Sequence, residues 1–148
     1  MATIIDIADA VAAALNAHTF SAPLTARRSY RPVFDLKEMK TLHVTIVPKG
    51  AEMTAAGRGL EQTDVQIDVA VQKKLSADTA AETGEIDALM GLVEQIAAVI
   101  RQKRRFALHG GGDAVWIKTD NVPIFSQEHL GEMRQFTSVL TLTLRVIG

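Results

Sequence analysis

The chain has 148 residues, of which 47% are hydrophobic and 22% are charged, a composition typical of one soluble globular domain. Sixteen basic and 17 acidic residues give a formal net charge of −1, so the overall charge favours neither a nucleic-acid nor a membrane partner. With no cysteine, disulfides, thiolate nucleophiles and cysteine-ligated zinc are excluded. No apolar run is long enough to span a bilayer, and the first residues lack the pattern of a secretory signal.

The first predicted element is an amphipathic helix over residues 3–17. Its apolar residues recur at helical spacing, at Ile4, Ile7, Ala8, Val11 and Leu15. A weaker strand-like run follows over residues 23–34. Because Pro32 has no backbone N–H to donate, we expect this second element at the edge of a sheet.

Two strands with alternating apolar and polar residues come next, at residues 42–50 (LHVTIVPKG) and 64–74 (DVQIDVAVQKK). The alternation predicts half-buried strands with one face in water, and the short spacing between them predicts an antiparallel hairpin. The connection, at about residues 49–63, is much longer than the roughly two to five residues typical of hairpins. We therefore expect a projecting, mobile loop that orders on a partner, with an assembly surface made by Met53, Gly57, Arg58, Gly59 and Leu60.

The strongest helical pattern covers residues 84–105. One continuous apolar face runs along it, and acidic residues near its start and basic residues at its end match the helix dipole. Leu92 and Val99, seven residues apart, form a second apolar strip. This strip indicates either a wide buried arc or contact with another subunit.

A basic cluster closes this helix, with four basic residues in five positions: Arg101, Lys103, Arg104 and Arg105. Such clusters at helix ends usually serve the helix dipole and solubility. In a nearly neutral chain it is also the densest positive charge, so it can meet phosphate or an acidic partner.

His109 and the three glycines after it resemble the oxyanion loop of lipases and esterases. In those hydrolases the loop follows a strand and the nucleophile lies in G-x-S-x-G, whereas here the glycines follow a helix and no such motif occurs. We expect the glycine run to end the helix and to reverse the chain into the next strand. The four histidines show no metal-ligand spacing, so we expect no catalytic residue, metal site or cofactor. A small hydrolase using His109 stays as the alternative from another functional class.

A short strand at residues 113–118, a helical turn capped by Ser126 and a long alternating strand at 136–148 complete the chain. The element order predicts one α+β domain over residues 1–148. Its mainly antiparallel sheet is expected to carry the N-terminal helix and the long second helix on one face.

Three stretches carry a resemblance to a known family: LHVTIVPKGAEMTAAGRGLEQTDVQIDVAVQKKL, GEIDALMGLVEQIAAVI and FSQEHLGEMRQFTSVLTLTLRV. In these phrases and in element order, nearly the whole chain resembles tail-terminator proteins of long-tailed bacteriophages and prophages. The resemblance implies a structural virion protein without enzyme activity or cofactor, which forms a six-membered ring.

That ring would stack on the last ring of the tail-tube protein, stop polymerisation and offer a docking surface to the head-side connector. The resemblance implies a place in the tail-neck region of the virion, with the host cytoplasm as the site of assembly and no membrane. It also lets the basic cluster face the channel and touch packaged DNA without sequence specificity. Another neck, head–tail joining or tail-completion protein is the nearest alternative.

Overall fold

A computed structural model describes residues 4–31, 40–76 and 79–148. Across these ranges it contains three α-helices and six strands, which confirms the α+β class. The helices are α1 (Ile4–Asn16), α2 (Glu82–Lys103) and α3 (Gln127–Met133), and a 3-10 turn, η2 (Thr79–Ala81), precedes α2. The strands are β1 (Ala26–Arg28), β2 (His43–Gly57), β3 (Leu60–Lys74), β4 (Arg105–Ala107), β5 (Asp113–Asp120) and β6 (Gln135–Ile147).

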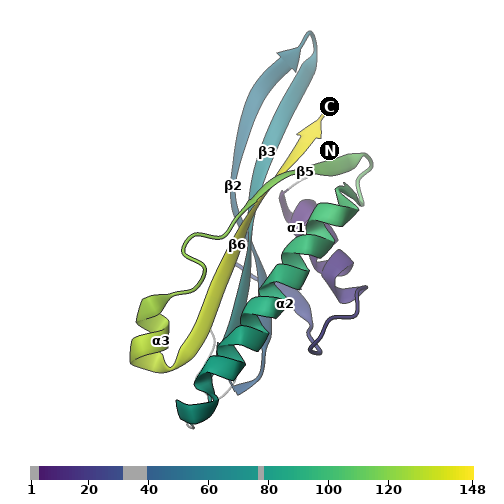
Figure 1. The fold of residues 1–148 in the computed structure, drawn as a ribbon. Helices are drawn as coiled ribbons and strands as arrows, with labels where there is room; N and C mark the ends of the chain where they lie inside the picture. Colours follow the sequence, from purple (N-terminus) through teal and green to yellow (C-terminus); the bar gives the residue numbers. More distant parts are fainter. Residues whose placement is uncertain (1–3, 32–39, 77–78) are drawn as a thin grey trace.

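The strands form one curled, mostly antiparallel sheet in the order β1-β2-β3-β6-β5-β4 (Figure 1). β1 is the exception, since it pairs in parallel with Val44–Ile46 of β2. It lies at one edge of the sheet, as predicted for that segment, although Pro32 itself lies outside the described residues. The long strands β3 and β6 pair over almost their whole length and form the middle of the sheet.

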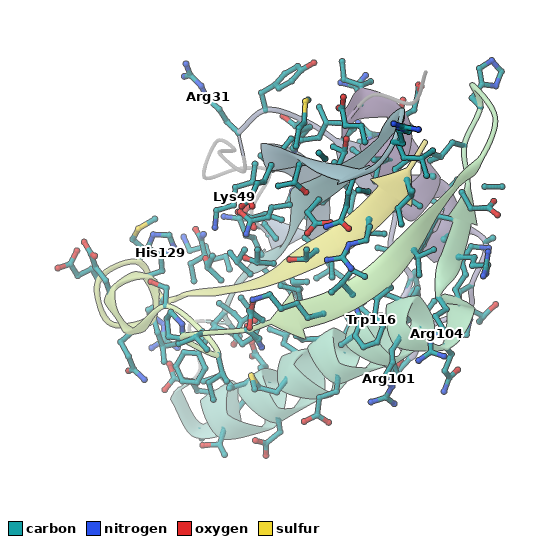
Figure 2. The ribbon with its side chains drawn as sticks, turned by 90° about the horizontal axis from the view of Figure 1, so that it is seen from above. Arg31, Lys49, Arg101, Arg104, Trp116 and His129 are labelled. Atoms are coloured by element: carbon teal, nitrogen blue, oxygen red, sulfur yellow. The ribbon has the colours of Figure 1, made fainter. Side chains whose placement is uncertain are left out.

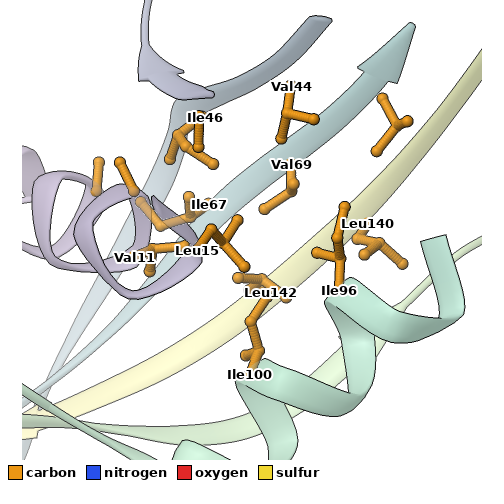
Figure 3. Close-up of a cluster of buried hydrophobic side chains, with 14 of the residues drawn as sticks. Val11, Leu15, Val44, Ile46, Ile67, Val69, Ile96, Ile100, Leu140 and Leu142 are labelled. Atoms are coloured by element: carbon orange, nitrogen blue, oxygen red, sulfur yellow. The ribbon is translucent and has the colours of Figure 1, made fainter. Parts of the chain in front are cut away.

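The core forms where the apolar side chains of α1 and α2 meet those of β2, β3 and β6 (Figure 3). Register explains which strand residues take part, because Ile46 faces Val69 and Ile67 faces Leu142, so the apolar positions of neighbouring strands share one side of the pleat. The core members labelled in the close-up are Val11, Leu15, Val44, Ile46, Ile67, Val69, Ile96, Ile100, Leu140 and Leu142. Burying each such side chain contributes about 1.5–3 kcal/mol.

The glycine run does not end the long helix, contrary to our expectation. α2 stops at Lys103, and its C-cap is Arg104, a non-glycine residue with φ 65°. β4 follows at once, and the glycines then form the turn between β4 and β5, where Gly111 and Gly112 have φ 98° and 76°. The glycines do take left-handed conformations, as expected. They do so in the sharp turn between two paired strands and not at the end of the helix.

Candidate assembly and binding surfaces

The β-ribbon, which we define as residues 49–63, is the most exposed part of the described fold. The mobile loop predicted there is wrong: β2 and β3 continue to Gly57 and Leu60, and a two-residue turn joins them. Gly59 has φ 73° in that turn, a conformation that glycine adopts without strain. Figure 1 shows the two strands rising past the end of α2 and past the C-terminal end of β6.

Backbone pairing, not side-chain pattern, makes this segment a ribbon. Residues 50–57 are rich in glycine and alanine, which are depleted in strands, so the sequence reads as a loop. Their backbones nevertheless pair with β3, whose own continuation pairs with β6 up to Gly148 through two hydrogen bonds with Glu61 of 3.0 and 3.2 Å. The central strands therefore provide a template that the local propensity does not reveal.

One edge of the β-ribbon is open within the described chain. β1 covers only Val44–Ile46 of β2, and Ser29 adds one backbone hydrogen bond to the Ile46 carbonyl. Beyond Ile46, the edge of β2 that faces away from β3 has no strand beside it among the described residues. Open edges of this length are ready to pair with another chain.

The predicted assembly residues lie on this β-ribbon, and its exposed apolar side chains are Met53 and Leu60, at 67% and 49% exposure. Ile147 on the neighbouring end of β6 is exposed as well. Arg58 and Gly59 form the tip, and Gly57 precedes it with φ 143°. The structure therefore brings together the set that the sequence singled out, on two paired strands instead of a loop.

Two carboxylates, Asp64 and Asp68, hold the base of the β-ribbon to β6, and both lie on the polar side of the alternating pattern that predicted this strand. Arg145 donates to both carboxylate oxygens of Asp64 at 2.8 and 3.1 Å. These hydrogen bonds, with the nearby positive charge, hold the pKa of Asp64 below its ordinary value, although partial burial opposes them. Asp68 accepts a hydrogen bond from Thr141 at 2.8 Å and lies 3.9 Å from the Lys49 ammonium.

The basic cluster is split by the structure. Arg101 and Lys103 lie in the last turn of α2, Arg104 caps the helix, and Arg105 begins β4. All four are exposed. Arg105 lies 3.8 Å from Asp113, and the Lys103 ammonium lies 5.8 Å from the centre of the Phe106 ring.

In the second apolar strip on α2, Leu92 is only 1% exposed within the protomer. Leu92 therefore belongs to a wide buried arc of the helix. A side chain with no accessible surface cannot contact another subunit, so the interface reading is wrong for Leu92. Val99 is half-buried and packs against the same core. The reason is the curled sheet, which with α1 surrounds more of α2 than a flat sheet would.

His109 borders an open pocket of about 500 Å³ together with Asp6, Asp9, Ala10, Ala107 and Leu108. The described lining carries no hydroxyl or thiol nucleophile, and Asp9 already accepts a hydrogen bond from Arg28 at 2.8 Å. Among the residues described, no three His, Asp or Glu side chains gather where they could hold a metal ion. Among the described lining residues, His109 therefore has two carboxylates near it but no hydroxyl or thiol side chain.

The described residues thus form an α+β protein with a projecting β-ribbon, an open edge on β2 and a basic cluster at the end of α2. No protein-family model matches the chain, and no curated protein is significantly similar to it. No helix in the described ranges has the length and apolar character to cross a membrane.

Proposed function

We propose that this chain is a structural protein of a phage or prophage tail, which forms a closed ring on the head-proximal end of the tail tube. In that position it ends tube polymerisation and gives the head-side connector a surface on which to dock. The observation that carries the proposal is the β-ribbon, which leaves the core, buries none of its own tip and exposes apolar side chains to solvent.

The open edge of β2 supports ring formation. A closed ring needs two different, complementary surfaces on each subunit, and a free edge continued by exposed Met53 and Leu60 is suited to pair with a neighbouring copy. The resemblance in sequence supports six copies in the ring. In this account Val99 is close enough to the surface to lie at the subunit contact, while Leu92 belongs to the core.

In this proposal the two partners bind at opposite ends of the long axis of the molecule. The tip of the β-ribbon and the C-terminal end of β6 lie toward one pole, and α3 lies toward the other (Figure 1). Exposed apolar residues occur near both poles, with Met53 and Leu60 at one and Ile124 and Met133 at the other. We assign the β-ribbon pole to the tail tube and neighbouring subunits, and the α3 pole to the head-side connector.

The test is coassembly with the tail-tube protein of the same phage or prophage. Tubes polymerised alone should have no defined end, whereas tubes formed with this protein should carry one ring at one end and stop growing, as seen by negative-stain microscopy. A protein that binds along the tube wall, or never binds tubes, contradicts the proposal. Binding to isolated connectors but not to tube ends would favour the alternative of another neck or head–tail joining component.

The hydrolase alternative makes the opposite prediction for His109. If that residue served catalysis, His109→Ala would abolish function while leaving ring and tube binding intact. We expect this variant to bind and terminate tubes normally.

A further inference from the structure

The corner where α2 ends and β5 begins carries two arginines and the chain's one tryptophan. Figure 2 shows Arg101, Arg104 and Trp116 on the same side of the molecule, away from Arg31 and Lys49. A backbone hydrogen bond of 2.7 Å, from the Trp116 N–H to the Arg104 carbonyl, joins the two elements. We call this the arginine–tryptophan corner.

Arg104 occupies a backbone conformation that disfavours its own side chain. Its φ of 65° and ψ of −44° fall where glycine is the relaxed residue. Strain of this kind persists where the surrounding structure or function requires the residue. Glycines occur only a few positions later, at 110–112, so this chain uses glycine for left-handed backbone nearby but retains arginine here.

Arg134, the C-cap of α3, is the natural comparison because it too has positive φ, at 48°. Its side chain has partners inside the protomer: it donates to the Ser76 carbonyl at 2.7 Å and lies 3.4 Å from the Glu82 carboxylate. Arg104 and Arg101 make no ion pair or side-chain hydrogen bond with any described part of the chain. The fold therefore accounts for the arginine at 134 and leaves the one at 104 unexplained.

The helix dipole accounts for part of the basic cluster but not for this residue. The dipole favours cations within the last turn, which covers Arg101 and Lys103. Arg104 lies beyond that turn, and a glycine there would relieve the backbone without removing those two charges. A role for the guanidinium outside the protomer explains its retention.

The neighbouring residues fit such a role. Arg101 lies in the last turn of α2 and Arg104 at its C-cap, and both lie on the same side of the molecule (Figure 2). Trp116 is half-buried and packs against the core, and its indole N–H donates to Thr119 at 2.8 Å. Its backbone hydrogen bond to Arg104 ties this ordered residue to the unpaired arginines, whose guanidinium groups suit a planar or oxygen-rich anion.

We propose that the arginine–tryptophan corner binds the phosphate backbone of duplex DNA without reading its sequence. Arginine forks bind phosphate oxygens in a bidentate manner, and phosphate contacts of this kind carry no base specificity. The site belongs to the surface of the protomer, so it goes beyond ring formation and holds whether or not the ring assembles.

The experiment titrates the purified full chain with a duplex of mixed sequence, following its anisotropy through a label and the fluorescence of Trp116, the one tryptophan present. Binding should weaken with salt by about 0.9 in log–log slope per phosphate contact. The double variant Arg101→Glu, Arg104→Glu should weaken binding at least tenfold at low salt and lower the slope by about two. The matched control, Arg31→Glu with Lys49→Glu, makes the same charge change on the far side and should alter binding less than threefold.

Equal loss in both double variants would show that net charge alone governs binding, which overturns the site. Unchanged binding in the corner variant overturns it as well, and so does binding to vesicles of anionic lipid or to polyglutamate as tight as to the duplex.

A second variant separates binding from folding. Arg104→Gly relaxes the backbone, so its melting temperature should stay the same or rise while DNA affinity falls severalfold. Arg134→Gly should instead lower the melting temperature and leave DNA affinity unchanged, because it removes the contacts to Ser76 and Glu82. A drop in melting temperature for Arg104→Gly would assign that arginine to the fold and contradict the proposal.

Discussion

The two halves of the β2–β3 hairpin share a backbone pairing pattern but have opposite surroundings. In the half formed by residues 43–48 and 65–74, apolar side chains such as Ile46 and Ile67 are fully buried against α1 and α2. In the β-ribbon half, every residue from 51 to 61 is exposed. A strand can therefore continue, by backbone pairing with an ordered neighbouring strand, beyond the point where its side chains contribute to the core.

Such an extension brings no core burial, so stability alone does not explain it. Hydrophobic burial is the dominant favourable contribution to folding, and the β-ribbon adds little of it while leaving an edge that invites aggregation. This balance supports our proposal that the β-ribbon serves contact with another molecule. Variants in each half of the hairpin can separate the half that supports the fold from the β-ribbon half, which we assign to assembly.

The largest expected difference is in stability after truncation of one side chain in each half. Ile67→Ala removes a fully buried side chain and should lower the free energy of unfolding by about 2–5 kcal/mol. Met53→Ala changes an exposed residue and should alter it by less than about 0.5 kcal/mol. Urea unfolding of both variants, followed by circular dichroism, measures the two values, and comparable losses would show that the β-ribbon is part of the core structure.

The next effect is on assembly. Replacing residues 53–63 by Asn-Gly joins Glu52 to Asp64, which already face each other in the register, and a two-residue turn of this type suits a hairpin. We expect a folded protein, with a melting temperature near normal, that no longer caps tail tubes. A double change to serine at Met53 and Leu60 keeps the β-ribbon length and serves as the matched variant. It should weaken capping less than the shortened ribbon does, because it removes apolar surface but keeps the backbone edge.

A smaller effect concerns the ion pair at the base of the β-ribbon. Because Arg145 holds the pKa of Asp64 below its ordinary value, the pair stabilises the folded state above the unfolded pKa of about 3.9. That contribution disappears as pH falls through the lower, folded pKa. Asp64→Asn should therefore lower the melting temperature slightly at pH 7 and by less at about pH 3, below the unfolded pKa. An equal difference at both pH values would contradict the assignment.

The smallest effect is expected at the turn between β4 and β5. His109 is exposed and its pocket has no hydroxyl or thiol side chain among the described lining residues, so we expect His109→Ala to leave the melting temperature, ring formation and tube capping within error of the native protein. Loss of function in a folded, ring-forming His109→Ala protein would restore the hydrolase alternative.

The sequence predicted elements with a strong periodic pattern. The alternation around Ile46, Ile67 and Leu142 placed the three long strands, and the apolar spacing around Ile7 and Ile96 placed both long helices. In each case the pattern records which side chains the fold buries, and burial is what periodicity reports.

What the sequence did not predict depends on contacts between distant segments. The alanines and glycines of the β-ribbon give no strand signal, because their pairing is imposed by β3 and β6. For Leu92 the sequence left a buried arc and a subunit contact both open, and the structure decides between them because the side chain is only 1% exposed within the protomer. Of the candidate surface, Met53 and Leu60 could be named in advance, whereas the open edge of β2 and the strained Arg104 required the structure.

We propose that the β-ribbon joins copies of this chain into a closed ring. Native mass spectrometry of the full chain and of the shortened variant, over a range of protein concentrations, tests it most directly. We expect the 16.0 kDa native chain to give one discrete oligomer whose share rises with concentration by mass action, while the shortened variant stays monomeric. A native protein that remains monomeric at every concentration and on tube ends, or a shortened variant that forms the same oligomer, would contradict it.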